Sequence, residues 1–141
     1  MNAEAVTLKF TIGGFGSGYE RIIWQDNKLH HHLFNHAYPE DKEVMPDEVL
    51  IEVAPLPKEW EKFWKTIDEL KVWNWDKEYF NKHIMDGTQW ELNIKRQGKR
   101  RRKIFGSNAY PEPNGTFTTF IKTLNKLSDS EIKFEEDEFQ S

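Results

Sequence analysis

The sequence predicts an α+β domain: an antiparallel sheet of five or six strands with two helices packed on one face, in the order βββ(β)αββα. Apolar and polar residues alternate along several short segments, and apolar residues recur at three- and four-residue intervals along two others. The predicted strands are also joined by connections short enough for antiparallel pairing. A length of 141 residues fits one domain. We expect this domain to span residues 1–128, followed by an acidic C-terminal tail over residues 129–141.

The N-terminal part is predicted to be a meander of strands. Residues 5–12 alternate between apolar and polar side chains, which is typical of a strand with one buried face. The remaining strands are expected at residues 19–24, at 29–34 and, as a short extra strand, at 49–53. Helices on one face leave the other partly wet, where aromatic side chains such as Trp24 or Tyr19 are candidates for a recognition surface.

Helical spacing predicts both helices. Pro57 suits a first helical turn, where its missing N–H costs nothing, and an apolar stripe then runs from Trp60 to Leu70. The second helix is expected from Phe117 to Leu127. Between the helices we expect an aromatic connector at residues 73–80 and a hairpin with one arm at 90–94, a tip at Gln97-Gly98 and a return arm at 99–105.

Composition excludes several classes of protein. The chain has no cysteine, which rules out disulfides, thiolate zinc sites and a cysteine nucleophile. It does not open with a basic region followed by an apolar stretch, and no apolar run approaches the length of about 20 residues that crosses a bilayer. We therefore expect a cytoplasmic protein with no membrane partner.

Charge is distributed unevenly around a net value of −4. Residues 40–52 and the tail are acidic. Between them, seven cations and no acid surround the expected hairpin tip: Lys95, Arg96, Lys99, Arg100, Arg101, Arg102 and Lys103. This segment, residues 95–103, is called the basic hairpin below and is the candidate binding site.

Three interpretations fit the basic hairpin. It is a solvated edge strand kept soluble by charge, a contact site for phosphates, or a contact site for an acidic protein surface. Alternation along the return arm predicts that Arg102 and Lys103 point to opposite faces, so a flat basic patch is smaller than the number of cations suggests. The acidic pI and the acidic tail weigh against nucleic acid as the main partner.

Two other segments suggest sites but have simpler explanations. The glycine-rich residues 13–18 lack both the following helix and the Gly-Lys-Ser/Thr ending of a phosphate loop, so a hairpin turn is expected. On a strand, His30 and His32 would project from one face, and with His31 and His36 they suggest a zinc or nickel site. Nothing in the spacing requires a third ligand, and an exposed edge strand is the alternative.

The C-terminal half contains a pattern that resembles one found in other proteins. Asp86-Gly87, Trp90 and the run Gly106-Ser107-Asn108-Ala109-Tyr110-Pro111, followed by a phenylalanine-rich helix, resemble small uncharacterised bacterial proteins with a DG-x-x-W and G-S-N-x-Y-P pattern. The resemblance covers roughly residues 58–127 and implies a strand pair joined to a helix through a fixed loop, with no activity attached. In size and character the chain also resembles small anti-CRISPR inhibitors of Cas9 carried by mobile elements, which implies an inhibitor that binds such an effector.

No catalytic arrangement of histidine, carboxylate and nucleophile is recognisable, so we expect no catalytic residues, metal or cofactor. The expected function is that of a non-catalytic macromolecule-binding protein, a small bacterial or mobile-element inhibitor with a protein partner such as Cas9. The alternative is a nucleic-acid-binding accessory protein that uses the basic hairpin.

Overall fold

The computed structural model describes residues 4–14, 18–35, 45–81 and 87–134. Its elements, in chain order, are β1 (Thr7–Gly14), β2 (Gly18–Gln25), β3 (Lys28–Phe34), β4 (Glu48–Val53), α1 (Pro57–Glu69), the 3-10 helix η1 (Val72–Asn74), β5 (Glu78–Phe80), β6 (Thr88–Lys95), β7 (Arg102–Ser107) and α2 (Thr116–Ser128). The strands form one sheet in the order β4-β3-β2-β1-β6-β7-β5.

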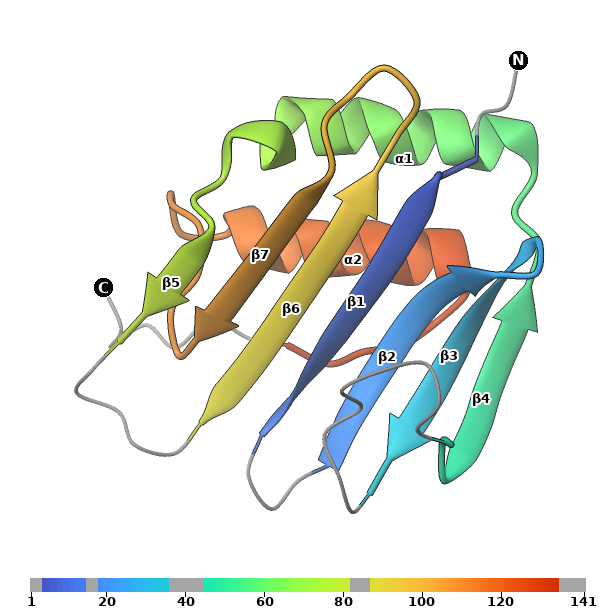
Figure 1. Cartoon of the computed structure of the whole chain (residues 1–141), viewed down its shortest axis with the longest axis horizontal. Helices are drawn as coiled ribbons and strands as arrows, with labels where there is room; N and C mark the ends of the chain where they lie inside the picture. The colour runs from blue at the N-terminus through green and yellow to red at the C-terminus, as the bar shows by residue number, and fades with distance from the viewer. Residues whose placement is uncertain (1–3, 15–17, 36–44, 82–86, 135–141) are drawn as a thin grey trace.

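Both helices lie on the same face of this sheet (Figure 1). The predicted α+β class, with two helices on one face, is therefore confirmed. The described sheet has seven strands, one more than the upper expectation, and it is mixed because β5 pairs parallel to β7 while the other pairs are antiparallel.

Strand β5 is the one described strand that the sequence did not predict. Its three residues are too few to show a period of two, and they fall within the expected aromatic connector. Backbone hydrogen bonds hold it to β7: Phe105 N–H donates to the carbonyl of Lys77 at 2.9 Å, and Asn81 N–H donates to that of Ser107 at 3.1 Å. The sheet is thereby extended beyond the hairpin.

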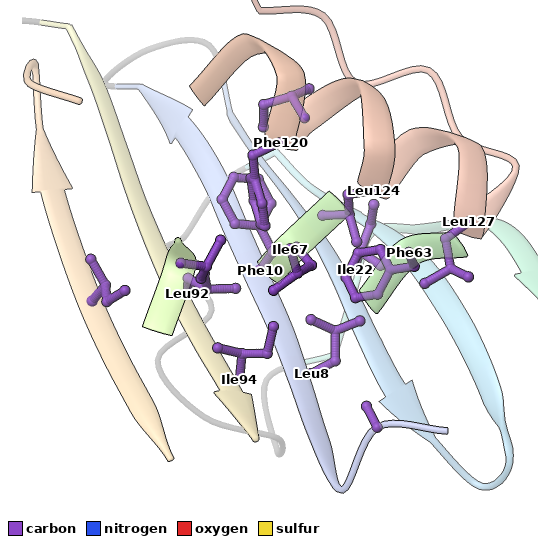
Figure 2. Close-up of a cluster of buried hydrophobic side chains, with 14 of the residues drawn as sticks. Leu8, Phe10, Ile22, Phe63, Ile67, Leu92, Ile94, Phe120, Leu124 and Leu127 are labelled. Atoms are coloured by element: carbon purple, nitrogen blue, oxygen red, sulfur yellow. The ribbon is translucent and has the colours of Figure 1, made fainter. Parts of the chain in front are cut away.

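Apolar side chains from the sheet and both helices form one continuous core (Figure 2). Phe10, in the central strand β1, is fully buried and contacts Phe117 and Phe120 of α2, with ring centroids 6.0 and 5.3 Å apart. From α1, Phe63 and Ile67 enter the same core. The predicted apolar stripes of both helices are the buried ones.

The face to which Trp24 points differs from the expectation. Trp24 follows Ile22 at a spacing of two, so both side chains point toward the helices, and the Trp24 ring packs edge-on against Trp60 of α1 at 5.0 Å. The prediction that Trp24 is a recognition residue on the open face was therefore wrong. Tyr19 does lie on the sheet face away from the helices, which is called the open face below, and there it pairs with Gly13 and Phe34.

The chain beyond α2 packs back along that helix. The side-chain amide of Asn125 donates to the carbonyl of Ile132 at 2.9 Å and accepts from its N–H at 3.0 Å. Ile132 is buried in the core, and Phe134 contacts Tyr110 and Phe117 with centroids 4.9 Å away in each case. Residues 130–134 thus belong to the folded domain, and residues 135–141 lie outside the described part.

Candidate binding surface

The basic hairpin extends past the ends of the neighbouring strands (Figure 1). β6 ends at Lys95 and β7 begins at Arg102, which pairs with Ile94, so residues 96–101 form the connection. The turn is closed by the Lys99 N–H, which donates to the carbonyl of Arg96 at 3.0 Å. The expected tip at Gln97-Gly98 is in place, but the expectation that the return strand starts at residue 99 was wrong.

Two of the seven cations are held on the helix side by the protein itself. The guanidinium of Arg96 lies over the ring of Trp64, 5.2 Å from its centroid, and donates to Oδ2 of Asp68 at 3.4 Å. Arg102 donates to the backbone carbonyl of Trp75. These contacts fasten the base of the hairpin to α1 and to the segment after η1.

Two more cations are placed by the strands. Lys95 is half-buried, and its Nζ donates to the carbonyl of Lys99 at 2.7 Å, which also stiffens the turn. Lys103 is exposed and pairs with Asn93 on the open face, opposite in direction to Arg102, as the alternation predicts.

Three cations remain at the tip. Lys99, Arg100 and Arg101 are exposed, and within the described ranges none of them forms an ion pair. Arg101 makes only a long hydrogen bond, 3.3 Å, to the hydroxyl of Thr7. The free positive charge is therefore concentrated at the end of a turn that two anchored arginines and one lysine hold in place. These three residues are called the hairpin tip below.

The histidines divide between the two faces of the sheet. His31 is buried on the helix side, where its Nε2 is 2.9 Å from Oε1 of Glu20. His30 and His32 share the open face, as predicted, with ring centroids 5.7 Å apart. His30 bonds to the Gln25 carbonyl at 3.0 Å through Nε2 and lies 3.4 Å from Glu52 through Nδ1.

His32 is coupled to a buried arginine. Arg21 is 3% exposed, its guanidinium stacks on Phe34 at 4.8 Å, and it donates to Nδ1 of His32 at 3.1 Å. Burial, together with the positive charge of Arg21, lowers the pKa of His32 to about 4. A neutral imidazole that accepts from arginine has its lone pair engaged, so this nitrogen is a poor metal ligand.

No metal site is found in the part of the chain that the structure describes, where no three histidine or acidic side chains are grouped to hold an ion. His36 lies outside that part, as do residues 40–44 of the first acidic block. Within the same part, no helix is long and apolar enough to cross a membrane.

Two grooves were not predicted from the sequence. The first lies between α1 and α2, has a volume of about 530 Å³, and is floored by Phe63 and Leu127. Its rim carries more lysine than acid: Lys62, Lys65, Lys122 and Lys126 against Glu59 and Glu69. These lysines are ordinary solvent-facing positions of each helix, and only the packing of the helices brings them together.

The second groove lies beside β5 and has a volume of about 940 Å³. Four aromatic residues line it: Trp75, Tyr79, Phe80 and Tyr110. Four acidic residues also line it, against a single Lys71: Glu69, Asp76, Glu78 and Glu112. It is called the acidic groove below, and apart from Glu69 and Leu70 at the end of α1 its residues come from segments that were expected to be connectors.

The DG-x-x-W and G-S-N-x-Y-P pattern builds one wall of the acidic groove. Trp90 donates from its indole N–H to the carbonyl of Ala109 at 3.1 Å. Gly106 is required beneath Trp90, because a Cβ at this position would overlap the indole ring. Asn108 is buried with φ 55°, and its N–H donates to the Thr88 carbonyl at 2.9 Å. The pattern thus fixes the loop that carries Tyr110, and Asp86 lies outside the described residues.

Comparison of the chain with models of protein families, with curated proteins and with solved structures finds no match.

Proposed function

We propose that the protein is a non-catalytic binding module that docks on a larger protein through the hairpin tip. The observation that supports this proposal is that the protein holds some of the seven cations in contacts of its own and leaves the others exposed. Arg96 and Arg102 are engaged with α1 and with Trp75, while Lys99, Arg100 and Arg101 stand exposed without an ion pair in the described ranges. A preorganised tip of this kind loses little conformational entropy when it meets a complementary surface.

An acidic protein surface suits this tip better than a nucleic acid backbone. Phosphate tracking uses several cations spread along a groove or face, and here Arg102 and Lys103 point to opposite sides of the sheet. The net charge of −4 also repels nucleic acid at long range. The resemblance to anti-CRISPR inhibitors makes Cas9 the first partner to test.

The alternative is a nucleic-acid-binding accessory protein, and one observation favours it. The groove between α1 and α2 adds four lysines on the helix side of the molecule, the side to which Arg96 also turns. In this alternative the lysine-lined groove and the hairpin tip would contact phosphates together.

Salt dependence separates the two functions. Binding of generic duplex and single-stranded nucleic acid is titrated at low and at physiological salt, with the native protein and with a variant in which Lys99, Arg100 and Arg101 are alanine. We expect negligible affinity at physiological salt for both, because an acidic protein with three free cations releases few counterions. Binding to Cas9, or to a partner recovered after nuclease treatment, should weaken in the variant at fixed salt.

A matched variant changes the same number of charges elsewhere, with Lys62, Lys65 and Lys122 replaced by alanine. It should bind the protein partner as the native chain does. Roughly micromolar nucleic acid affinity at physiological salt that disappears in the hairpin variant would overturn the proposal. A log–log salt slope that falls by about one for each removed cation would then establish the alternative.

A further inference from the structure

The acidic groove combines features that a structural connector does not need. Phe80 is a large apolar side chain that is 56% exposed and contacts Phe105 at 5.6 Å on the sheet face away from the helices, while Tyr79 and Tyr110 are half-buried on the helix side. Aromatic faces left open to solvent in a concave site are typical of binding sites. No ion pair within the described residues involves any of the four carboxylates of the groove, and the side chains of Glu78 and Glu112 are exposed.

The walls of the acidic groove are rigid. Tyr79 stacks on the buried Trp90, with centroids 5.9 Å apart and planes at 29°, and its hydroxyl accepts the backbone N–H of Asp76 at 2.9 Å. On the opposite wall, Tyr110 packs against Phe117 at 5.0 Å. Aromatic rings held by the core in this way are preorganised, so a ligand need not pay for ordering them.

One rim of the groove is an edge of the sheet as far as the described residues form it. β5 is the last strand in the sheet order, and the backbone groups of Lys77 and Asn81 point toward β7. Because successive residues of a strand direct their backbone groups to opposite sides, the N–H and C=O groups of Glu78 and Phe80 point away from β7. An extended peptide can pair with these groups and add a strand.

From these observations we propose that the acidic groove binds an extended, cationic peptide segment of a partner protein, through its arginine or lysine side chains. On the sheet face away from the helices, cations of the peptide lie over Phe80 and beside Glu78, and on the helix side they lie over Tyr110 and beside Glu112, while the peptide backbone pairs with the outer edge of β5. Arginine fits best, since its planar guanidinium both stacks on aromatic rings and bonds to carboxylates. This site is separate from the hairpin tip, and the proposal does not depend on the function proposed for that tip.

The ligand class follows from the combination of surfaces. An anionic or phosphorylated ligand meets four carboxylates and one lysine, so electrostatic repulsion excludes it. A purely apolar peptide leaves these carboxylates without partners and desolvates them at a cost. Only a cation satisfies both the aromatic faces and the acidic rim.

The test uses a short labelled peptide that repeats Arg-Arg-Val, so that arginines project to both faces of an added strand, and a matched peptide with glutamine in place of arginine. Binding of each to the full-length protein is followed by fluorescence anisotropy at low salt. We expect the arginine peptide to bind and the glutamine peptide to bind at least roughly fivefold more weakly. Changing Glu78→Gln together with Glu112→Gln should weaken the arginine peptide by roughly fivefold, and Phe80→Ala by roughly threefold.

A matched pair, Glu61→Gln with Glu131→Gln, removes the same charge at exposed positions outside the groove and should leave the affinity unchanged. Methylating the peptide backbone at alternate nitrogens should also weaken binding, because it removes the edge pairing. Equal affinity for the arginine and glutamine peptides, or an equal loss in both double variants, overturns the proposal. Alanine at the hairpin tip must not weaken this peptide, which keeps the test independent of the function proposed above.

Discussion

At the scale of single residues, the open face of β2 and β3 contains an arrangement that the sequence did not indicate. Arg21 is buried between the ring of Phe34 and the imidazole of His32. Alternation correctly predicted that His30 and His32 share a face. It did not predict that Arg21 lies directly opposite His32, because that depends on the register between two strands, which the turn sets and composition does not.

The pH dependence of stability tests this contact. The pKa of His32 falls from 6.5 to about 4 on folding, chiefly through burial and then through the charge of Arg21, so the unfolded chain binds more protons between these values. The stability contribution is therefore complete above pH 6.5 and is lost as the pH falls toward 4. Three other groups also affect the pKa of this imidazole through their charge: His30 and His31 lower it, and Glu52 raises it.

Urea unfolding followed at several pH values should show the effect. Between pH 7 and pH 4.5 the free energy of unfolding of the native protein should fall by roughly 1–2 kcal/mol through His32, an amount discounted because solvent reaches part of the side chain. The His32→Asn variant should not show this fall. Asparagine retains an acceptor for Arg21. Identical pH slopes for the two proteins would show that His32 is not the group that titrates.

At the scale of elements, the sequence contained most of the fold. Alternation located β1 and β6, β-prone runs between turn signals located β2, β3 and the short β4, and helical spacing located both helices with their buried faces. Strand β5 was missed because three residues carry no period. The acidic groove was missed for a related reason: it joins the 3-10 region, β5 and the loop before α2, and only the parallel pairing of β5 with β7 brings these segments together.

Trp64 links the docking of α1 to the position of the basic hairpin. It is 2% exposed, stacks against Trp60 and Trp73 at 5.9 and 6.1 Å, and supports the guanidinium of Arg96. Trp64→Ala should lower the free energy of unfolding by about 3–5 kcal/mol, measured by denaturant titration, because it leaves a large cavity under α1. The control is Phe80→Ala, an exposed aromatic whose loss should cost less than about 1 kcal/mol. A change that small at Trp64 would contradict the burial of this helix face.

At the scale of the whole molecule, charges of opposite sign are displayed on different surfaces. The hairpin tip and the lysine-lined groove are basic, while the acidic groove at the β5 end of the sheet is not. The uneven charge distribution was visible in the sequence, where the acidic blocks are residues 40–52 and the tail. Neither block supplies the carboxylates of the acidic groove. The acids of the groove are scattered through segments between residues 69 and 112, and folding alone collects them. The net charge therefore says little about which partners each surface accepts.

One continuous core predicts one cooperative unit. The buried cluster includes side chains from the N-terminal meander, both helices, β6 and β7, and it extends to Ile132 beyond α2. Tryptophans report on different parts of that core, with Trp60 on the buried face of α1 and Trp90 between β5 and α2. Urea unfolding monitored by tryptophan fluorescence and by far-UV circular dichroism should therefore give coincident transitions with a single midpoint. Asn125→Ala, which frees the backbone of Ile132, should shift both transitions together, since residues 130–134 pack on the same core. Separate midpoints would show that the meander and the C-terminal half unfold independently, in spite of the eight residue pairs that join β1 to β6.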